Sequence, residues 1–404
     1  MELKRINNFL VVFIILCSTS FYHFSVLGPV QKVAEFAGIG LIVALILFHI
    51  VYDDSKSIPR HFGGPIFLII LSIFTSMAMA IIFRNQSFGQ TMMAQKALYF
   101  YLFYFLLHQL KVRPVDLEKI FMALGLFFVV LYLVQFILYP KIIFDAYIRE
   151  ARGTIRIYMA GGGYMTIAFF LTVQSFLRTT RIKSLVLVVI IFSIIVLNGG
   201  RQTMAIMSLM VVLFVLFDKK VKSKLFLVFL GTVGAFAIFL IFQGIFEALI
   251  LQSQSDAGKG ADYIRIRAAN YYLTEFYKTP LAYITGNGAF LADSEYGKMI
   301  RQNALVYRFY LGDIGLIGNY IIYGVFFLIG VITINIRTLI IKIESQYIYI
   351  RYMFLAVIFS LLTSAAFSQP DYIVLFSCLF YIIDVSKSNL EQNLKTEEDI
   401  IKFK

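Results

Sequence analysis

The residues best suited to chemistry are eight arginines that fall in two stretches of the chain, 149–201 and 265–308. They are Arg149, Arg152, Arg156, Arg201, Arg265, Arg267, Arg301 and Arg308. A guanidinium group forms planar, forked hydrogen bonds to phosphate oxygens and keeps its charge when it is partly buried. The set therefore predicts a site for an anionic ligand. The alternative is that single arginines pair with nearby acids such as Glu150 and Glu275, or extend to lipid headgroups.

Arg201 has the most specific surroundings of the eight. It follows Asn198-Gly199-Gly200 and is expected to open a helix. Glycines let the backbone come close to a ligand, and a helix N-terminus presents free N–H groups and the positive end of the helix dipole. With the arginine side chain, these features predict a compact phosphate site. The alternative is a simple hairpin turn whose arginine reaches toward lipid headgroups.

The spacing of the remaining arginines predicts which of them share a surface. Arg301 and Arg308 are seven residues apart, so they lie on one face if a helix covers both. Arg265 and Arg267 differ by about 200° around a helix, so only one of them is expected to face a ligand. Tyr271 is one of eight tyrosines between 263 and 310 whose rings could stack on sugars. The alternative is an aromatic belt at a membrane interface.

Carboxylates in the same region could supply a general base, because an attacking hydroxyl needs a proton acceptor within hydrogen-bond reach. The candidates are Asp293, Glu295 and Asp313, of which Glu295 is preferred. Three of the four histidines, His49, His61 and His108, fall near lysine-rich loops, and only His23 approaches the arginine-rich loops. Because this pattern contains no cluster of metal ligands, we expect chemistry that uses neither a metal nor another cofactor.

The composition indicates the elements that must position these residues. The chain is 60% hydrophobic and only 15% charged, whereas a soluble domain is about 25% charged. Its apolar runs are continuous and of helix length, which excludes the alternating pattern of a barrel. The net charge of +13 is expected to hold loops on one side of a membrane and not to bind nucleic acid. Cys17 and Cys378 lie in apolar segments, so no disulfide framework is expected.

The hydropathy pattern predicts an all-α, polytopic integral membrane protein with about twelve transmembrane helices. The expected spans are 8–27, 36–52, 65–83, 96–110, 117–139, 161–177, 185–199, 203–217, 225–246, 312–336, 350–368 and 371–385. Lysine and arginine recur in alternate loops, which the positive-inside rule assigns to the cytoplasm together with both termini. The first span, which follows Lys4 and Arg5, is expected to remain uncleaved because no small-residue cleavage site follows it.

Four regions follow from this map. Residues 1–246 carry nine spans and the first arginine-bearing external loops, and residues 247–311 form a large extracytoplasmic loop. Residues 312–385 carry the last three spans, and residues 386–404 form a polar cytoplasmic tail. The large loop is too long to lack secondary structure in a compact protein, so it is expected to contain a helix over 261–278 that ends before Pro280.

Three stretches resemble motifs of the O-antigen polymerase and ligase superfamily, the Wzy-type polymerases of bacterial surface polysaccharides. ARGTIRIYMAGGGYM (151–165) is similar to the family's Arg-Gly loop before a central helix. VLNGGRQTMAIMSL (196–209) looks like its short helix, arginine-bearing turn and next helix. KTPLAYITGNGAF, followed by RQNALVYRFYLGDIGLIGNYIIYG, resembles its glycine loop, later asparagine and Gly-x-x-Gly helix start. Many members carry a histidine before the asparagine that is Asn303 here, but this chain has Gln302, so a histidine base is not supported at that position.

The resemblance implies a metal-independent glycosyltransferase of the bacterial inner membrane whose active site faces the periplasm or exterior. Its donor would be an oligosaccharide on a polyprenyl pyrophosphate, its product a surface polysaccharide, and its partners a flippase and chain-length regulator proteins. The implied catalytic residues are Arg201, Glu295 and Asp313. The implied substrate-binding residues are Arg152, Arg156, Arg265, Arg267, Arg301, Arg308, Asn303 and Tyr271. Alternatives are a ligase that transfers finished glycan, a flippase or other transporter of lipid-linked oligosaccharide, and a scaffold without chemistry.

Overall fold

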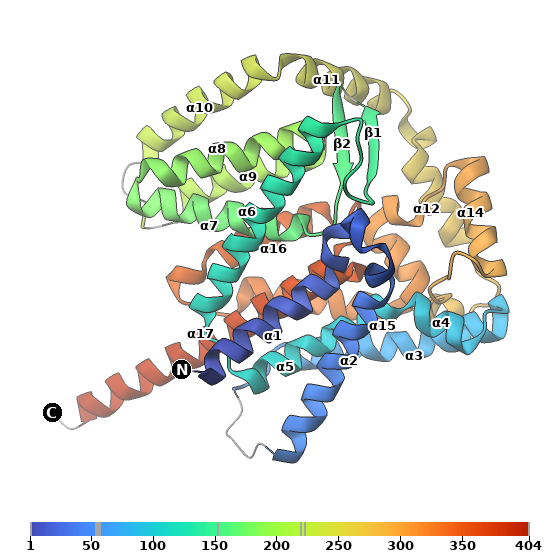
Figure 1. Cartoon of the computed structure of the whole chain (residues 1–404), viewed down its shortest axis with the longest axis horizontal. Coiled ribbons are helices and arrows are strands. Elements are labelled where there is room, and N and C mark those ends of the chain that lie inside the picture. Colours follow the sequence, from blue (N-terminus) through green and yellow to red (C-terminus); the bar gives the residue numbers. More distant parts are fainter. Residues whose placement is uncertain (1, 53–57, 152, 219, 222–223, 403–404) are drawn as a thin grey trace.

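The computed structural model describes residues 2–52, 58–151, 153–218, 220–221 and 224–402. This part of the chain is almost entirely helical, which confirms the predicted all-α class (Figure 1). The first half contains α1 (Glu2–Ser18), α2 (Gly28–Tyr52), α3 (Gly63–Arg84), α4 (Phe88–Ala94), α5 (Leu102–Leu110), α6 (Pro114–Leu138), α7 (Gly162–Thr179), α8 (Ile182–Leu197) and α9 (Arg201–Phe217). The second half contains α10 (Lys224–Ile241), α11 (Gln243–Ala257), α12 (Ile264–Thr274), α13 (Ala282–Thr285), α14 (Glu295–Tyr307), α15 (Gly315–Ile340), α16 (Tyr349–Ser360) and α17 (Pro370–Lys402).

Each of the twelve predicted apolar segments contains a helix, although some helices are shorter than expected. Within the described part of the chain, five stretches are long and apolar enough to cross a membrane: Val33–Val51, Gly63–Arg84, Pro114–Leu138, Leu311–Ile340 and Pro370–Leu394. A sixth candidate is the pair Gly231–Ile241 and Gln243–Ala257, which is bent by 89°. Large apolar side chains such as Phe74 and Ile137 remain 55% and 75% exposed on these helices. Lipid is the solvent that covers such surfaces, so the structure supports a membrane-embedded protein.

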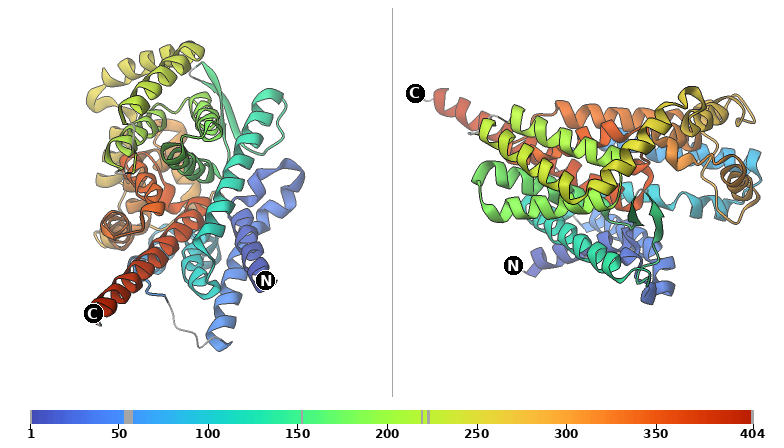
Figure 2. Two further views of the ribbon diagram at one scale, coloured as in Figure 1. Left: turned by 90° about the vertical axis from the view of Figure 1, so that its left-hand side faces the viewer. Right: turned by 90° about the horizontal axis from the view of Figure 1, so that it is seen from above.

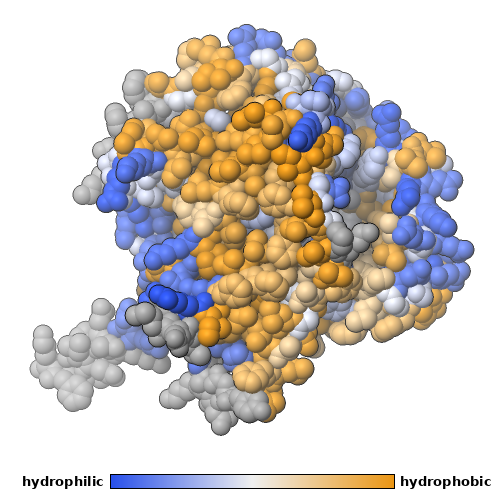
Figure 3. Space-filling view, in the orientation of Figure 1, coloured by the Kyte–Doolittle hydropathy of each residue, from blue (hydrophilic) through white to orange (hydrophobic). Residues whose placement is uncertain are grey.

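The helices run between two ends of the molecule that differ in character (Figures 1 and 2). One end holds both chain termini and the lysine-rich connections, where Arg178 donates to the Ser345 carbonyl at 2.6 Å and pairs with Asp218. The opposite end holds α4, the α12 and α14 helices and a short β-hairpin. On the face drawn in Figure 3, an apolar band separates hydrophilic residues at the two ends. This is the distribution expected of a protein that spans a bilayer.

Packing of α15 against α3 forms part of the main core, and α15 bends at Gly324 (φ 77°). The bend frees two carbonyls of α15, and these accept hydrogen bonds from the loop that carries the Gly-Asn-Gly motif. Asn287 N donates to Ile321 O at 2.9 Å and Gly288 N donates to Ile322 O at 2.8 Å. A Cβ atom at Gly286 would lie 2.3 Å from the Ile322 carbonyl oxygen, so only glycine permits this approach.

A smaller, separate core holds α12 and α14 together. Tyr272, Phe276, Tyr296 and Ile300 are buried in it, and the Ser294 side chain caps α14 by accepting a hydrogen bond from Gly297 N. The helix predicted over 261–278 is confirmed as the shorter α12, which ends before Pro280. The large predicted loop is therefore folded on the end of the helix bundle that lies opposite the chain termini.

Three local predictions need correction. The helix α14 ends at Tyr307 and Arg308 adopts a left-handed conformation (φ 59°), so Arg301 and Arg308 do not share a helical face. The first predicted span ends early, because α1 stops at Ser18 and a tight turn follows it. The region 386–402, predicted as a tail, continues the last helix α17.

Candidate functional site

A β-hairpin positions the first arginines. The strands β1 (Tyr147–Ala151) and β2 (Thr154–Tyr158) pair antiparallel, with Arg149 directly opposite Arg156. Like charges opposite one another are unfavourable in a sheet, which an anionic ligand would relieve. Arg156 is only 7% exposed, its Nε donates to the Asn198 carbonyl at 2.9 Å, and its guanidinium lies 4.9 Å from the Tyr158 ring centre. The hairpin is thus attached to the turn that precedes Arg201.

The hairpin arginines and Arg201 form one electrostatic group. Burial lowers the pKa of the Arg156 guanidinium, and Tyr158 opposes this effect. The positive charges of Arg149 and Arg201 lower the same pKa further. A group of like charges held together around a partly buried guanidinium attracts an anion more strongly than a single exposed arginine does.

Arg201 opens α9, as the sequence predicts, directly after Gly199 (φ 61°) and the N-cap residue Gly200. Its side chain pairs with α11, because Nη2 lies 2.7 Å from Asp256 and Nη1 donates to Ser253 Oγ at 2.8 Å. Lys259 shares the same carboxylate at 3.2 Å. The charges of Arg201, Lys259 and Asp256 therefore sum to one net positive charge, so these three side chains together still attract an anion.

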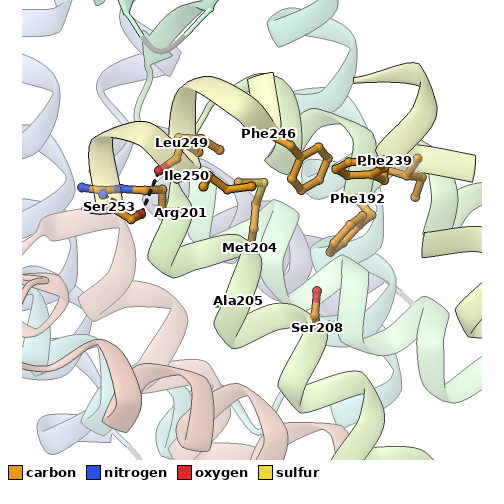
Figure 4. A pocket seen from close by; sticks show the side chains of 11 residues that line it. Phe192, Arg201, Met204, Ala205, Ser208, Phe239, Phe246, Leu249, Ile250 and Ser253 are labelled. Carbon is orange, nitrogen blue, oxygen red and sulfur yellow. Dashed lines mark hydrogen bonds between the residues drawn. The ribbon is translucent and has the colours of Figure 1, made fainter. Parts of the chain in front are cut away.

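An apolar cavity of about 350 Å³ begins at Arg201 and extends between α8, α9, α10 and α11. Figure 4 shows Arg201 and Ser253 at one end and the rings of Phe192, Phe239 and Phe246 toward the other. Apart from Arg201, the lining is almost entirely hydrophobic. Such a cavity suits a ligand with an extended apolar part and an anionic end.

Asn198 and Thr203, which flank Arg201 in the sequence, line a polar cavity of about 440 Å³. Its walls come from α1, α2, the hairpin and helices α6 to α9 and α17. Polar side chains that line it are Ser20, His23, Glu35, Tyr132, Asn198, Thr203 and Asp371. Asn198 Oδ1 is buried and has no hydrogen-bond partner in the described part of the chain. A cavity with donors, acceptors and aromatic edges suits a polyhydroxylated ligand such as a sugar.

The other predicted site residues lie on α12, on α14 and beyond it, and none of them lines either cavity. Glu295, Arg267, Arg301, Arg308 and Asp313 are exposed, and Arg265 is half-buried. Arg152 lies outside the described residues. The structure thus divides the predicted arginines into two groups. Arg149 and Arg156 lie on the hairpin, which is bonded to the turn before Arg201. Arg265, Arg267, Arg301 and Arg308 lie on or next to the helices of the smaller core.

Asn303 and Tyr271 serve the smaller core. Asn303 is 7% exposed and its Nδ2 donates to the Tyr271 hydroxyl at 3.2 Å, which holds α14 against α12. The Tyr271 ring packs 5.5 Å from the Phe309 ring. These contacts leave the Tyr271 ring engaged with protein, so its predicted stacking on a sugar has no support from its position.

Sequence reasoning missed several polar residues at the cavities. Asp256 belongs to a helix whose role the pattern did not reveal, and Glu35 lies at the edge of an apolar segment. Asp371 had the clearest signal, because an acid within a predicted span is uncommon and often functional. Among the described residues, no group of three or more His, Cys, Asp or Glu side chains could hold a metal ion.

No known protein family model matches this chain, and no curated protein is significantly similar to it. The two cavities, with Arg201 in the wall of the apolar one, are therefore the main observation that bears on function.

Proposed function

We propose that this protein polymerises lipid-linked oligosaccharides into a surface polysaccharide by glycosyl transfer. One observation carries the proposal: Arg201 lines the apolar cavity, and Asn198 and Thr203, which flank it in the sequence, line the polar cavity. A polyprenyl-pyrophosphate oligosaccharide has the matching order of parts, namely an apolar chain, two phosphates and a sugar. The resemblance of residues 151–165 and 196–209 to the O-antigen polymerase and ligase superfamily supports the same reading, because these stretches carry Arg156 and Arg201.

The membrane arrangement belongs to the same proposal. We infer about twelve crossings, in which the shorter apolar helices such as α8 and α9 span the bilayer together with the five long ones. The lysine-rich end that holds both termini would face the cytoplasm, following the positive-inside rule. The hairpin, both cavities and the α12–α14 core would then face the exterior of a bacterial inner membrane.

In the proposed reaction, a hydroxyl of the acceptor sugar attacks the anomeric carbon of the donor. The bond from that carbon to the pyrophosphate oxygen breaks, and the oxygen keeps the electron pair. Arg201, together with Arg156, which is hydrogen-bonded to the turn before it, would stabilise the charge that develops on the departing pyrophosphate. Loss of one fixed donor to a developing oxyanion reduces rates by about 10²–10³-fold in other enzymes. No metal is needed, since the neutralising charges belong to the protein.

The residues of the α12–α14 group keep a role in the proposal as a second, more distant surface. Arg265, Arg267, Arg301 and Arg308 would meet the outer part of a glycan or the acceptor lipid headgroup. Glu295 and Asp313 do not line the polar cavity, so neither is positioned to accept the proton of a hydroxyl bound there.

The decisive experiment uses the purified protein in vesicles with polyprenyl-pyrophosphate oligosaccharide as both donor and acceptor. We expect a ladder of products that differ by one repeat unit, together with release of polyprenyl pyrophosphate. Transfer of glycan only to a different acceptor would identify a ligase instead, and movement of intact substrate across the bilayer without new bonds would identify a transporter. In cells, removal of the protein should leave single repeat units and no long chains.

A further inference from the structure

The turn that follows α1 has an unusual backbone. Four successive residues other than glycine, Ser20, Phe21, Tyr22 and His23, have φ angles of 47°, 52°, 55° and 54°. An L-residue rarely adopts the left-handed region because its Cβ meets the following carbonyl. Such strain persists only where the surroundings impose it, and it clusters at functional sites. Two of these residues, Ser20 and His23, line the polar cavity.

Contacts from three directions hold the turn in place. Tyr22 is 1% exposed and packs edge-on against Phe127 of α6 at 5.4 Å. A Cβ atom at Gly161 would lie 2.5 Å from the Tyr22 ring, so the glycine lets the turn approach the start of α7. The His23 carbonyl accepts a hydrogen bond from Asp145 N at 2.7 Å, in the segment that leads into the hairpin. The position of His23 is therefore fixed by the fold.

A buried carboxylate lines the same cavity as this histidine. Asp371, 7% exposed, lies in the first turn of α17 and accepts a hydrogen bond from Gly161 N at 2.8 Å through Oδ2. That carboxylate is therefore already engaged by the backbone at the start of α7. Imidazole is the side chain that proteins most often use to accept a proton from a reacting hydroxyl.

We propose that His23 is the general base that accepts the proton of the acceptor hydroxyl. This inference rests on the proposed function. The hydroxyl loses its proton to the imidazole as its oxygen bonds to the anomeric carbon. The polyprenyl pyrophosphate leaves with the electron pair of the broken bond, and the imidazolium later returns its proton to water.

The other ionisable groups of this cavity are less suited to the same task. Glu35 of α2 accepts from Ser20 Oγ at 3.2 Å and pairs with Lys96 at 3.2 Å, so its charge is already matched. Tyr132, Tyr158 and Tyr372 also line the cavity, but phenols bind their protons too tightly to act as bases near neutral pH. His23 is the only histidine among the residues that line the cavity.

The test exploits the backbone of the turn. His23→Gly removes the imidazole at a φ angle that glycine favours, so the turn should be kept. Phe21→Gly is the matched control, because it makes the same change two residues earlier, at φ 52°, and leaves His23 in place. We expect His23→Gly to lose about 10²-fold or more in kcat, with normal protein abundance and with partial recovery on addition of imidazole. Phe21→Gly should retain activity near the wild-type level.

Recovery on addition of imidazole separates a proton acceptor from a structural residue, because free imidazole replaces only the missing base.

Two results would overturn the inference: His23→Gly with kcat within threefold of the wild type, or Phe21→Gly as inactive as His23→Gly. In the second case the turn, and not the imidazole, would be what the reaction needs. A wild-type protein that makes no polymer would refute the proposed function itself. An active wild type with an equally active His23→Gly variant would refute only the role of His23.

Discussion

The ion pair between Arg201 and Asp256 allows the catalytic and structural roles of Arg201 to be separated. The two side chains are 24% and 20% exposed, so the pair is only partly shielded from water. A pair of this kind contributes about 1 kcal/mol, and the hydrogen bond to Ser253 adds about 1 kcal/mol. Arg201→Ala is therefore expected to lower the free energy of unfolding by about 1–2 kcal/mol.

The expected effect on turnover is larger. If Arg201 stabilises the departing pyrophosphate, its removal should lower kcat about 10²–10³-fold, which corresponds to about 2.7–4 kcal/mol of transition-state stabilisation. Asp256→Asn breaks the same ion pair and leaves the guanidinium free. We expect this variant to lose a similar amount of stability, to keep kcat within about threefold, and to bind donor more tightly because the arginine has no competing carboxylate.

The assay is polymer formation from lipid-linked oligosaccharide in vesicles, read beside thermal unfolding of the same preparations. Arg201→Lys should recover only part of the rate, because an ammonium group cannot form the forked contact. Arg178→Ala is a positional control, since it breaks an ion pair at the opposite end, where the side chains are 20% and 8% exposed. Equal losses of kcat in Arg201→Ala and Asp256→Asn would refute the reasoning. The ion pair would then affect activity only by fixing α11 against α9.

Three further predictions concern topology, stability and cofactors. A cysteine at exposed Ser255 should react with a membrane-impermeant thiol reagent from the outside, and a cysteine at exposed Lys342 should react only after lysis. The native thiols Cys17 and Cys378 are buried and should not react. The reverse pattern would invert the proposed orientation. Arg84→Met should lower the free energy of unfolding by about 3–5 kcal/mol, because buried Arg84 donates to Phe276 O and Asn287 Oδ1 at 2.6 Å each; a loss below about 1 kcal/mol, measured by chemical unfolding in detergent, would contradict this. Polymerisation should continue in excess chelator, and activity that returns only with a divalent ion would show that a metal is required.

The sequence predicted those features that depend on local physical chemistry. Continuous apolar runs can be stable only as helices in lipid, so the positions of the twelve helical segments were readable from hydropathy. Glycines before Arg201 predicted correctly where α9 begins, and Pro280 predicted that the preceding helix ends before it. The sequence also singled out Asn303 and the Gly-Asn-Gly loop at 286–288. It did not predict that Asn303 bonds to Tyr271 of α12 or that the loop bonds to the bend of α15.

The same local reasoning failed where a helix ended for reasons outside its own periodicity. Arg301 and Arg308 have the spacing of one helical face, yet α14 stops at Tyr307. The following Phe309 is buried in the smaller core, with its carbonyl accepting a hydrogen bond from the Tyr272 hydroxyl at 3.1 Å. Packing of that aromatic residue, and not the pattern of charges, decides the direction of the chain at Arg308.

By itself, the sequence determined that the chain is a helical membrane protein and that Arg201 stands at a helix start. Only the tertiary structure decided which of these residues meet. Asp256 lies 55 residues beyond Arg201, and Asp371 lies 210 residues beyond Gly161, from whose backbone N–H it accepts a hydrogen bond. The physical reason is that helix positions follow from short-range periodicity and solvent, whereas contacts between distant helices depend on how whole surfaces pack.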